Sequence, residues 1–185
     1  MGDDMDMSKD CDMSSDVERS DDIQHVEEEG ARYTLQNNVL HGMYYSEHED
    51  VRQEIPYIHG VIHGEMRCFV NDKINMQIPY VDGKKHGVAH FYNNGLLVAE
   101  MTYTEDALTG ESKYFNEEGD LVREVALLNG REEGVSKTYY PTGELFELAH
   151  YHKGVLDGEV IRYKNNGDEM SRDQYQQGKK VPREK

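Results

Sequence analysis

The sequence predicts an all-β fold: an elongated antiparallel meander of stacked β-hairpin repeats, preceded by a disordered acidic N-terminal arm. Two observations predict it. From residue 33 onward the chain repeats itself every 22 to 24 residues, which is typical of repeat architectures. The 185 residues also include 17 Gly and 13 Tyr but only four Pro, which indicates many tight turns between aromatic-rich strands.

The arm is predicted from charge. Residues 1–32 hold 12 acidic and three basic residues and carry more than half of the net charge of −17. A segment with so few apolar residues cannot form a core, so we expect it to be disordered, with a short helix as an alternative around residues 17–29. Residues 33–185 then form an array of six hairpin repeats and a truncated seventh.

Two series of glycines fix the period of this array. One glycine in each unit keeps the register, and a second series from Gly95 to Gly167 steps by 24 residues each time. We call the first series the register glycines: Gly42, Gly64, Gly87, Gly110, Gly134 and Gly158. Two independent markers with the same period exclude coincidence.

Each unit is predicted to contain two strands and two turns. An aromatic and β-branched segment such as GVAHFY follows the register glycine, and a turn such as Asn93-Asn94-Gly95 ends it. A return strand such as LLVAEMTY then leads to a second turn, such as Val81-Asp82-Gly83. Glycine suits these turns because hairpin loops often need positive φ. Since a single hairpin is marginal in water, stability should come from stacking on neighbouring units.

The unit Y-x-x-G-x-x-x-G-x4-aromatic-x3-G resembles the MORN repeat, and more closely its variant form, which typifies the YwqK-type antitoxins of bacterial toxin–antitoxin systems. The best-matching stretch runs from Tyr80 to Tyr175. In the second unit Asn71-Asp72-Lys73 replaces the expected turn glycine, and the chain has neither the Trp nor the G-x-G of the standard MORN unit. The resemblance implies a β-hairpin array that binds a protein, and in the antitoxins sequesters and neutralises a toxin.

Two positions in the unit are candidate partner-binding sites. Position +5, counted from the register glycine, is aromatic in five units, and position +3 is basic in four units; strand alternation puts both on one face. They form either a packing ladder beside solvated cations or a partner-binding groove for an anion or an acidic partner. We call the candidate site the +3/+5 stripe: Arg67, His90, Lys113 and Lys137 with Tyr92, Phe115 and Tyr139.

Enzymatic and metal-binding functions are not expected. The sequence contains none of the common hydrolase, metalloprotease, nucleotide-binding or redox motifs, so neither catalytic residues nor a cofactor are predicted. His59 and His63 are four residues apart, but a turn between them breaks any helical ligand spacing, so no metal is predicted. The recurring His-Gly pairs, such as His41-Gly42, are interpreted as turn chemistry.

Charge and targeting signals define the expected compartment and partners. A net charge of −17 repels nucleic acid and attracts basic proteins. The chain has no apolar run long enough for a transmembrane segment and no secretory signal, and its two cysteines form no disulfide framework. These features predict a cytoplasmic protein.

The preferred function is therefore a non-enzymatic protein-binding repeat module, similar to antitoxins, with a basic toxin as its partner. The acidic arm would speed the encounter with that partner. One alternative is a structural adaptor whose terminal strands, around Tyr33 and Tyr175, allow end-to-end pairing. Another is a MORN-like membrane-surface module that binds anionic lipid, against which the net charge argues.

Overall fold

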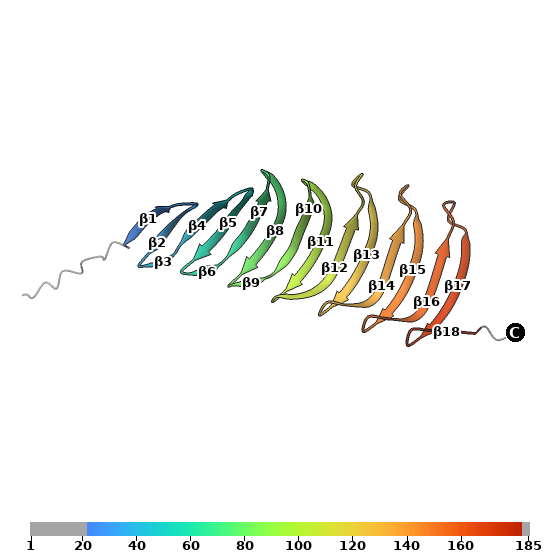
Figure 1. Cartoon of the computed structure of the whole chain (residues 1–185). Coiled ribbons are helices and arrows are strands. Elements are labelled where there is room, and N and C mark those ends of the chain that lie inside the picture. Colours follow the sequence, from blue (N-terminus) through green and yellow to red (C-terminus); the bar gives the residue numbers. More distant parts are fainter. Residues whose placement is uncertain (1–21, 183–185) are drawn as a thin grey trace, which may run out of the picture.

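The computed structural model describes residues 22–182, and these form one continuous antiparallel sheet of 18 strands in a single layer (Figure 1). The described part of the chain contains no helix, and hence none that could span a membrane. The predicted all-β meander is confirmed. Its strands are β1 (Ile23–Glu28), β2 (Ala31–Gln36), β3 (Val39–Leu40), β4 (Gly42–His48), β5 (Val51–Ile58), β6 (Val61–Ile62), β7 (Gly64–Val70), β8 (Lys73–Val81), β9 (Lys84–Lys85), β10 (Gly87–Asn93), β11 (Leu96–Thr104), β12 (Ala107–Phe115), β13 (Leu121–Leu128), β14 (Arg131–Tyr139), β15 (Leu145–His152), β16 (Val155–Tyr163), β17 (Glu169–Gln176) and β18 (Lys179–Val181).

The array begins earlier than the sequence predicts. Residues 23–28 form strand β1, where the arm, or a short helix around residues 17–29, was expected, and this strand pairs with β2 at residues 31–36. Val26 pairs with Tyr33 across this hairpin, and the Glu29-Gly30 turn joins its strands. This strand was not predicted because acidic side chains surround Ile23 and Val26, so that the charge of the segment indicated disorder. The rest of the expected arm, residues 1–21, lies outside the described residues.

Each unit contributes an ascending strand, which starts near the register glycine, and a return strand, which leads back to the next unit. All six register glycines have positive φ, between 89° and 125°. Each faces a large side chain on its return strand; for example, Gly64 pairs with Tyr80 and Gly87 with Tyr103. A ring beside a glycine in a sheet covers backbone that the glycine leaves exposed. This pairing explains why most units begin with Tyr.

The turns at the lower edge in Figure 1 link each unit to the one before it. They are two-residue turns, and Asn129 and Gly130, with φ of 50° and 76°, show the positive φ at both positions that matches strand twist. In each, the N–H of the second turn residue donates to a backbone carbonyl in the preceding unit. The donor and acceptor residues are Gly60 and Leu40, Gly83 and Ile62, Asp106 and Lys85, Gly130 and Leu108, Gly154 and Glu132, and Gly178 and Leu156.

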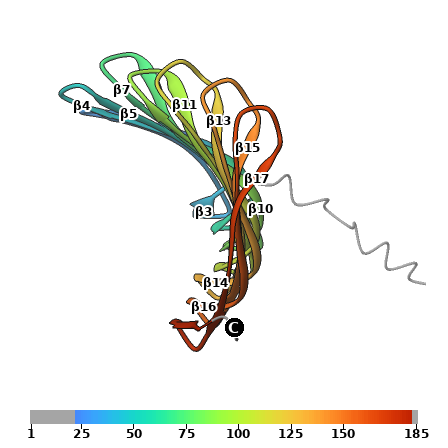
Figure 2. The same ribbon diagram turned by 90° about the vertical axis from the view of Figure 1, so that its right-hand side faces the viewer.

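Most of the core is a row of small side chains on one face, which we call the inner face, while Ile161 is buried on the opposite face. Direct cross-strand pairs run from Ser112 through Val125, Ser136 and Ala149 to Val160, and all five are 5% exposed or less. Among residues 22–182 no second sheet covers this row. Figure 2 shows that the strands are curved. Small residues at the bend let the larger side chains on either side close over them.

Replacing a register glycine should cost more stability where a neighbour also blocks the new side chain. Gly158→Ala would place Cβ 2.8 Å from Cβ of His150 at a φ of +125°. At Gly167, φ is +84° and nothing lies within 4 Å, so Gly167→Ala carries only the backbone cost of about 1–2 kcal/mol. We expect Gly158→Ala to lose about 1–3 kcal/mol more in urea unfolding. Equal losses would mean that no steric contact operates at residue 158.

Removing the hydroxyl of Ser112 should not destabilise the sheet. Ser112 is 0% exposed and its Oγ has no hydrogen-bond partner among the described residues, whereas Ser136 Oγ accepts a hydrogen bond from Arg123 Nε at 3.4 Å. Since a buried hydroxyl without a partner costs free energy, Ser112→Ala should be neutral or raise the unfolding free energy by up to about 1 kcal/mol. Ser136→Ala should lower it by about 0.5–1 kcal/mol. Thermal unfolding of both variants tests this difference, and the reverse order would contradict it.

Candidate functional site

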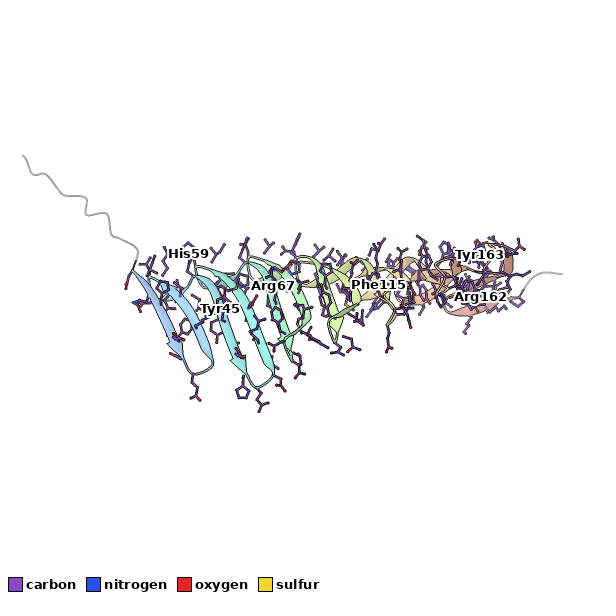
Figure 3. The ribbon with its side chains drawn as sticks, turned by 90° about the horizontal axis from the view of Figure 1, so that it is seen from above. Tyr45, His59, Arg67, Phe115, Arg162 and Tyr163 are labelled. Atoms are coloured by element: carbon purple, nitrogen blue, oxygen red, sulfur yellow. The ribbon has the colours of Figure 1, made fainter. Side chains whose placement is uncertain are left out.

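The four basic residues of the +3/+5 stripe lie in one straight row across the sheet, on the face opposite the inner face. Arg67 and His90 both pair with Gln77, and His90 and Lys113 both pair with Glu100. We call the full set of successive partners the charged row: Glu27, Arg32, Tyr45, Glu54, Arg67, Gln77, His90, Glu100, Lys113, Glu124, Lys137, Leu148, Ile161 and Arg172. Figure 3 labels Arg67 and Phe115 along the sheet.

Carboxylates from the return strands flank these basic residues, except that the amide of Gln77 lies between Arg67 and His90. Lys137 Nζ lies 3.4 Å from Glu124 Oε2, and His90 Nε2 lies 3.8 Å from Glu100 Oε1. Sequence reasoning missed these carboxylates because they occupy the row only through the hairpin register, which the sequence left open. The basic residues of the stripe therefore have carboxylates beside them in the charged row, and they do not form a purely basic groove.

Arg67 and Lys137 are more exposed than the carboxylates with which they pair, although Glu27 at the start of the row is itself exposed. The side chains of Arg67 and Lys137 are 46% and 45% exposed, whereas those of Glu54 and Glu124 are 16% and 19% exposed. The long cationic side chains extend past the shorter acidic ones. A molecule that approaches this face therefore meets the positive groups first. At about 4.8 Å between neighbouring strands, the stripe from β7 to β14 extends for roughly 30 Å.

The aromatic positions lie on the same face as the charged row. The hydroxyl of Tyr92 donates to Gln77 Oε1 at 2.6 Å, and the hydroxyl of Tyr139 donates to Glu124 Oε2 at 2.7 Å. Phe115 lies between these two rings in the ladder and is half-buried. At the start of the ladder, the guanidinium of Arg52 lies 3.8 Å from the ring centroid of Phe69. The rings thus pack along the sheet while keeping part of their surface exposed.

The carboxylate of Glu124, which belongs to the charged row, contacts both the hydroxyl of Tyr139 and the ammonium group of Lys137. The hydrogen bond from Tyr139 lowers its pKa most, and the hydrogen bond and charge of Lys137 lower it further against the opposing effect of burial. Burial, followed by the hydrogen bond to Glu124, raises the pKa of Tyr139 to about 12. Glu124 therefore stays ionised and Tyr139 stays protonated at neutral pH.

The histidines that the sequence singled out take part in turn contacts. The N–H of His59 donates to Nδ1 of His41 at 3.4 Å, and the N–H of Asp82 donates to Nδ1 of His63 at 3.4 Å. In later units Thr109 and Glu133 hold the position before the register glycine and accept from the N–H of the next turn in the same way. Among residues 22–182 no group of three or more ligand side chains is placed to hold a metal ion.

Removing the Tyr139 hydroxyl should raise the pKa of Glu124. In wild type the lowered pKa of Glu124 gives stability that is present above the unfolded-state pKa and is lost as pH falls through the folded-state pKa. The raised pKa of Tyr139 gives stability that is present below pH 10.0 and is lost as pH rises through about 12. Tyr139→Phe should remove the alkaline loss and reduce the acid loss, as measured by carboxyl NMR titration and by unfolding across pH.

Tyr140→Phe is the matched control for this prediction, because its hydroxyl donates to the carbonyl of Tyr163 and not to Glu124. It should leave the titration of Glu124 unchanged. If Tyr139→Phe also leaves that titration unchanged, the hydrogen bond between Tyr139 and Glu124 does not govern the carboxylate.

Comparisons with known proteins bear on the repeat unit. No curated protein matches the chain. One matching solved structure, titled "Crystal Structure of TarM", is 16% identical and covers 60% of this chain and 20% of its own chain, with a TM-score of 0.28. This chain thus spans about a fifth of that protein's length. The profile of the MORN repeat variant family matches residues 132–153, which lie in β14, β15, the turn between them and the first residue of the next turn. The fifth unit of the array therefore matches a MORN repeat variant.

Proposed function

We propose that this protein is a non-enzymatic binding module that holds a protein partner on the face carrying the +3/+5 stripe. The observation that carries the proposal is the charged row itself: an array of exposed to half-buried basic side chains beside half-buried rings, about 30 Å long. Tyr92, Phe115 and Tyr139 supply contact area that loses little side-chain entropy on binding. The cations supply specificity for a surface that carries carboxylates.

The finer form of this function is neutralisation of a toxin. It is supported by the resemblance of the repeat unit to antitoxins, and by the net charge of −17, which attracts a partner of net positive charge at long range, while a local carboxylate patch on that partner meets the stripe. The mechanism would be steric: a sheet about 30 Å long across the stripe covers the partner's active surface. The same module could instead hold proteins together as a scaffold, a role supported by the MORN repeat variant match in residues 132–153.

Charge reversal on the stripe tests this proposal. A pull-down from native lysate with the full chain identifies the partner, and calorimetry then measures its affinity. Lys113→Glu with Lys137→Glu places negative charge at two exposed positions of the row, so it should weaken binding of a carboxylate-bearing surface by about tenfold or more.

Lys84→Glu with Lys153→Glu is the matched control. Both residues lie at the lower edge, and the double variant changes the net charge by the same amount. If the stripe is the site, this control should retain affinity apart from a small salt-dependent effect. Equal affinity losses in the two double variants would show that only the overall charge matters, and full affinity in the stripe variant would place the partner elsewhere.

A further inference from the structure

The middle of the charged row is complementary to its own reverse. Its centre lies between β10 and β11, where His90 pairs with Glu100. Counted outward from this centre, each member of the row on one side has a counterpart at the same distance on the other side. The counterparts are Gln77 and Lys113, Arg67 and Glu124, Glu54 and Lys137, and Tyr45 and Leu148. Reversal of the row therefore brings basic side chains onto carboxylates and matches no two like charges.

The aromatic positions beside the row obey the same symmetry. Each ring of β7, β10 and β12 has an aliphatic side chain opposite it on the return strand, and cross-strand partners share a face of the sheet. The pairs are Phe69 with Ile74, Tyr92 with Leu97, and Phe115 with Leu121, and all six residues are half-buried. About the same centre, Phe69 has Leu121 as its counterpart, and Ile74 has Phe115. Reversal thus also brings apolar groups onto apolar groups.

A two-fold axis parallel to the strands produces this reversal. A second copy turned by half a turn about such an axis, placed above the face between β10 and β11, presents the same face with the order of its strands reversed. Both sheets keep the same hand of twist, so the strands of the two copies stay aligned, as they do in packed sheets. Figure 3 labels Arg67 and Phe115, which lie on opposite sides of this centre.

We propose that a second copy of this chain packs face to face on the charged row about this axis, with Arg67 of each copy on Glu124 of the other. Packed sheets lie about 10 Å apart, a gap that long cationic side chains cross. Glu124 keeps Lys137 of its own chain at 3.4 Å and gains a second cation. From β4 to β15 the contact measures roughly 45 Å by 15 Å, or about 700 Å² on each copy, close to the ~800 Å² of a standard interface.

This contact uses the same face as the proposed partner site, so a second copy and the partner would compete for it. It depends only on the charges and rings of that face and not on the existence of a partner. Failure of self-association would therefore leave the proposed function standing. The net charge of −17 opposes association at long range, but more than half of it belongs to residues 1–32, outside the matched strands. At about 0.15 M salt, repulsion beyond about 8 Å is largely screened.

The test is sedimentation velocity of the full chain at about 0.15 M salt, from micromolar concentration upward. The sedimentation coefficient of wild type should rise with concentration and level off at the value of a dimer, because a two-fold contact closes on itself. Arg67→Glu would meet Glu124 of the second copy, and Glu124→Lys would meet Arg67. Each variant should therefore lose about tenfold or more in association constant.

Lys153→Glu and Glu117→Lys are the matched controls. Both residues lie in turns outside the face, and the substitutions change the net charge by the same amounts as the two test variants. Both controls should dimerise like wild type. Equal losses in the controls and the test variants would show that net charge, and not the face, governs association, and would overturn the proposal.

Mixing the two test variants provides the decisive measurement. In a mixed dimer the two introduced charges face each other with opposite sign, and the unchanged Arg67 faces the unchanged Glu124. Association should therefore return to about the wild-type level, as it should in the double variant Arg67→Glu with Glu124→Lys. Circular dichroism checks that each variant is folded, and Glu54→Lys with Lys137→Glu tests the same axis at a second pair if one is not. A wild type that stays monomeric, one that grows beyond a dimer, or a mixture in which association does not return would contradict the proposal.

Discussion

The structure depends on one constraint: the sheet is a single layer, so each strand is held by its two neighbours and no other layer covers its side chains. Burial must therefore come from residues on the same face. The row from Ser112 to Val160 meets this condition because its members are small and the strands bend around them. A longer side chain at Ser112 or Ala149 would hold the flanking residues apart and expose the backbone beneath.

The same constraint explains the constant period. Each unit must place its turn within hydrogen-bonding reach of the unit before it, as Gly130 does with Leu108 at 2.8 Å. The side chain before the register glycine adds a second contact to that turn, whether it is the His63 ring or the Glu133 carboxylate. Chemically different residues serve there because the turn N–H requires only an acceptor. The glycine is more restricted, since its positive φ and its facing Tyr leave little freedom.

How much the sequence could predict follows from which features are local. Strands, turns and the shared face of positions +3 and +5 depend on neighbours in the chain, and they were predicted. The carboxylates Glu100 and Glu124 were not, because they enter the row through the pairing of two strands. That register shifts at irregularities such as the one between Phe91 and Tyr92, which leave no clear mark in the sequence. The strand at residues 23–28 was missed because its acidic side chains outweigh Ile23 and Val26 in composition.

In a single-layer sheet that extends in one direction, the two faces can serve different functions. The inner face buries a row of small side chains, and the opposite face carries the charged row, in which Arg67 is exposed and Ile161 is buried. Alternation in the charged row allows many ionised side chains to lie on one thin sheet, because Glu124 offsets both Lys113 and Lys137 through their pairing. Most of the net charge can then reside outside the row, at the N-terminal end. A partner on the stripe face thus meets a local pattern of charge that differs from the acidic N-terminal part of the chain.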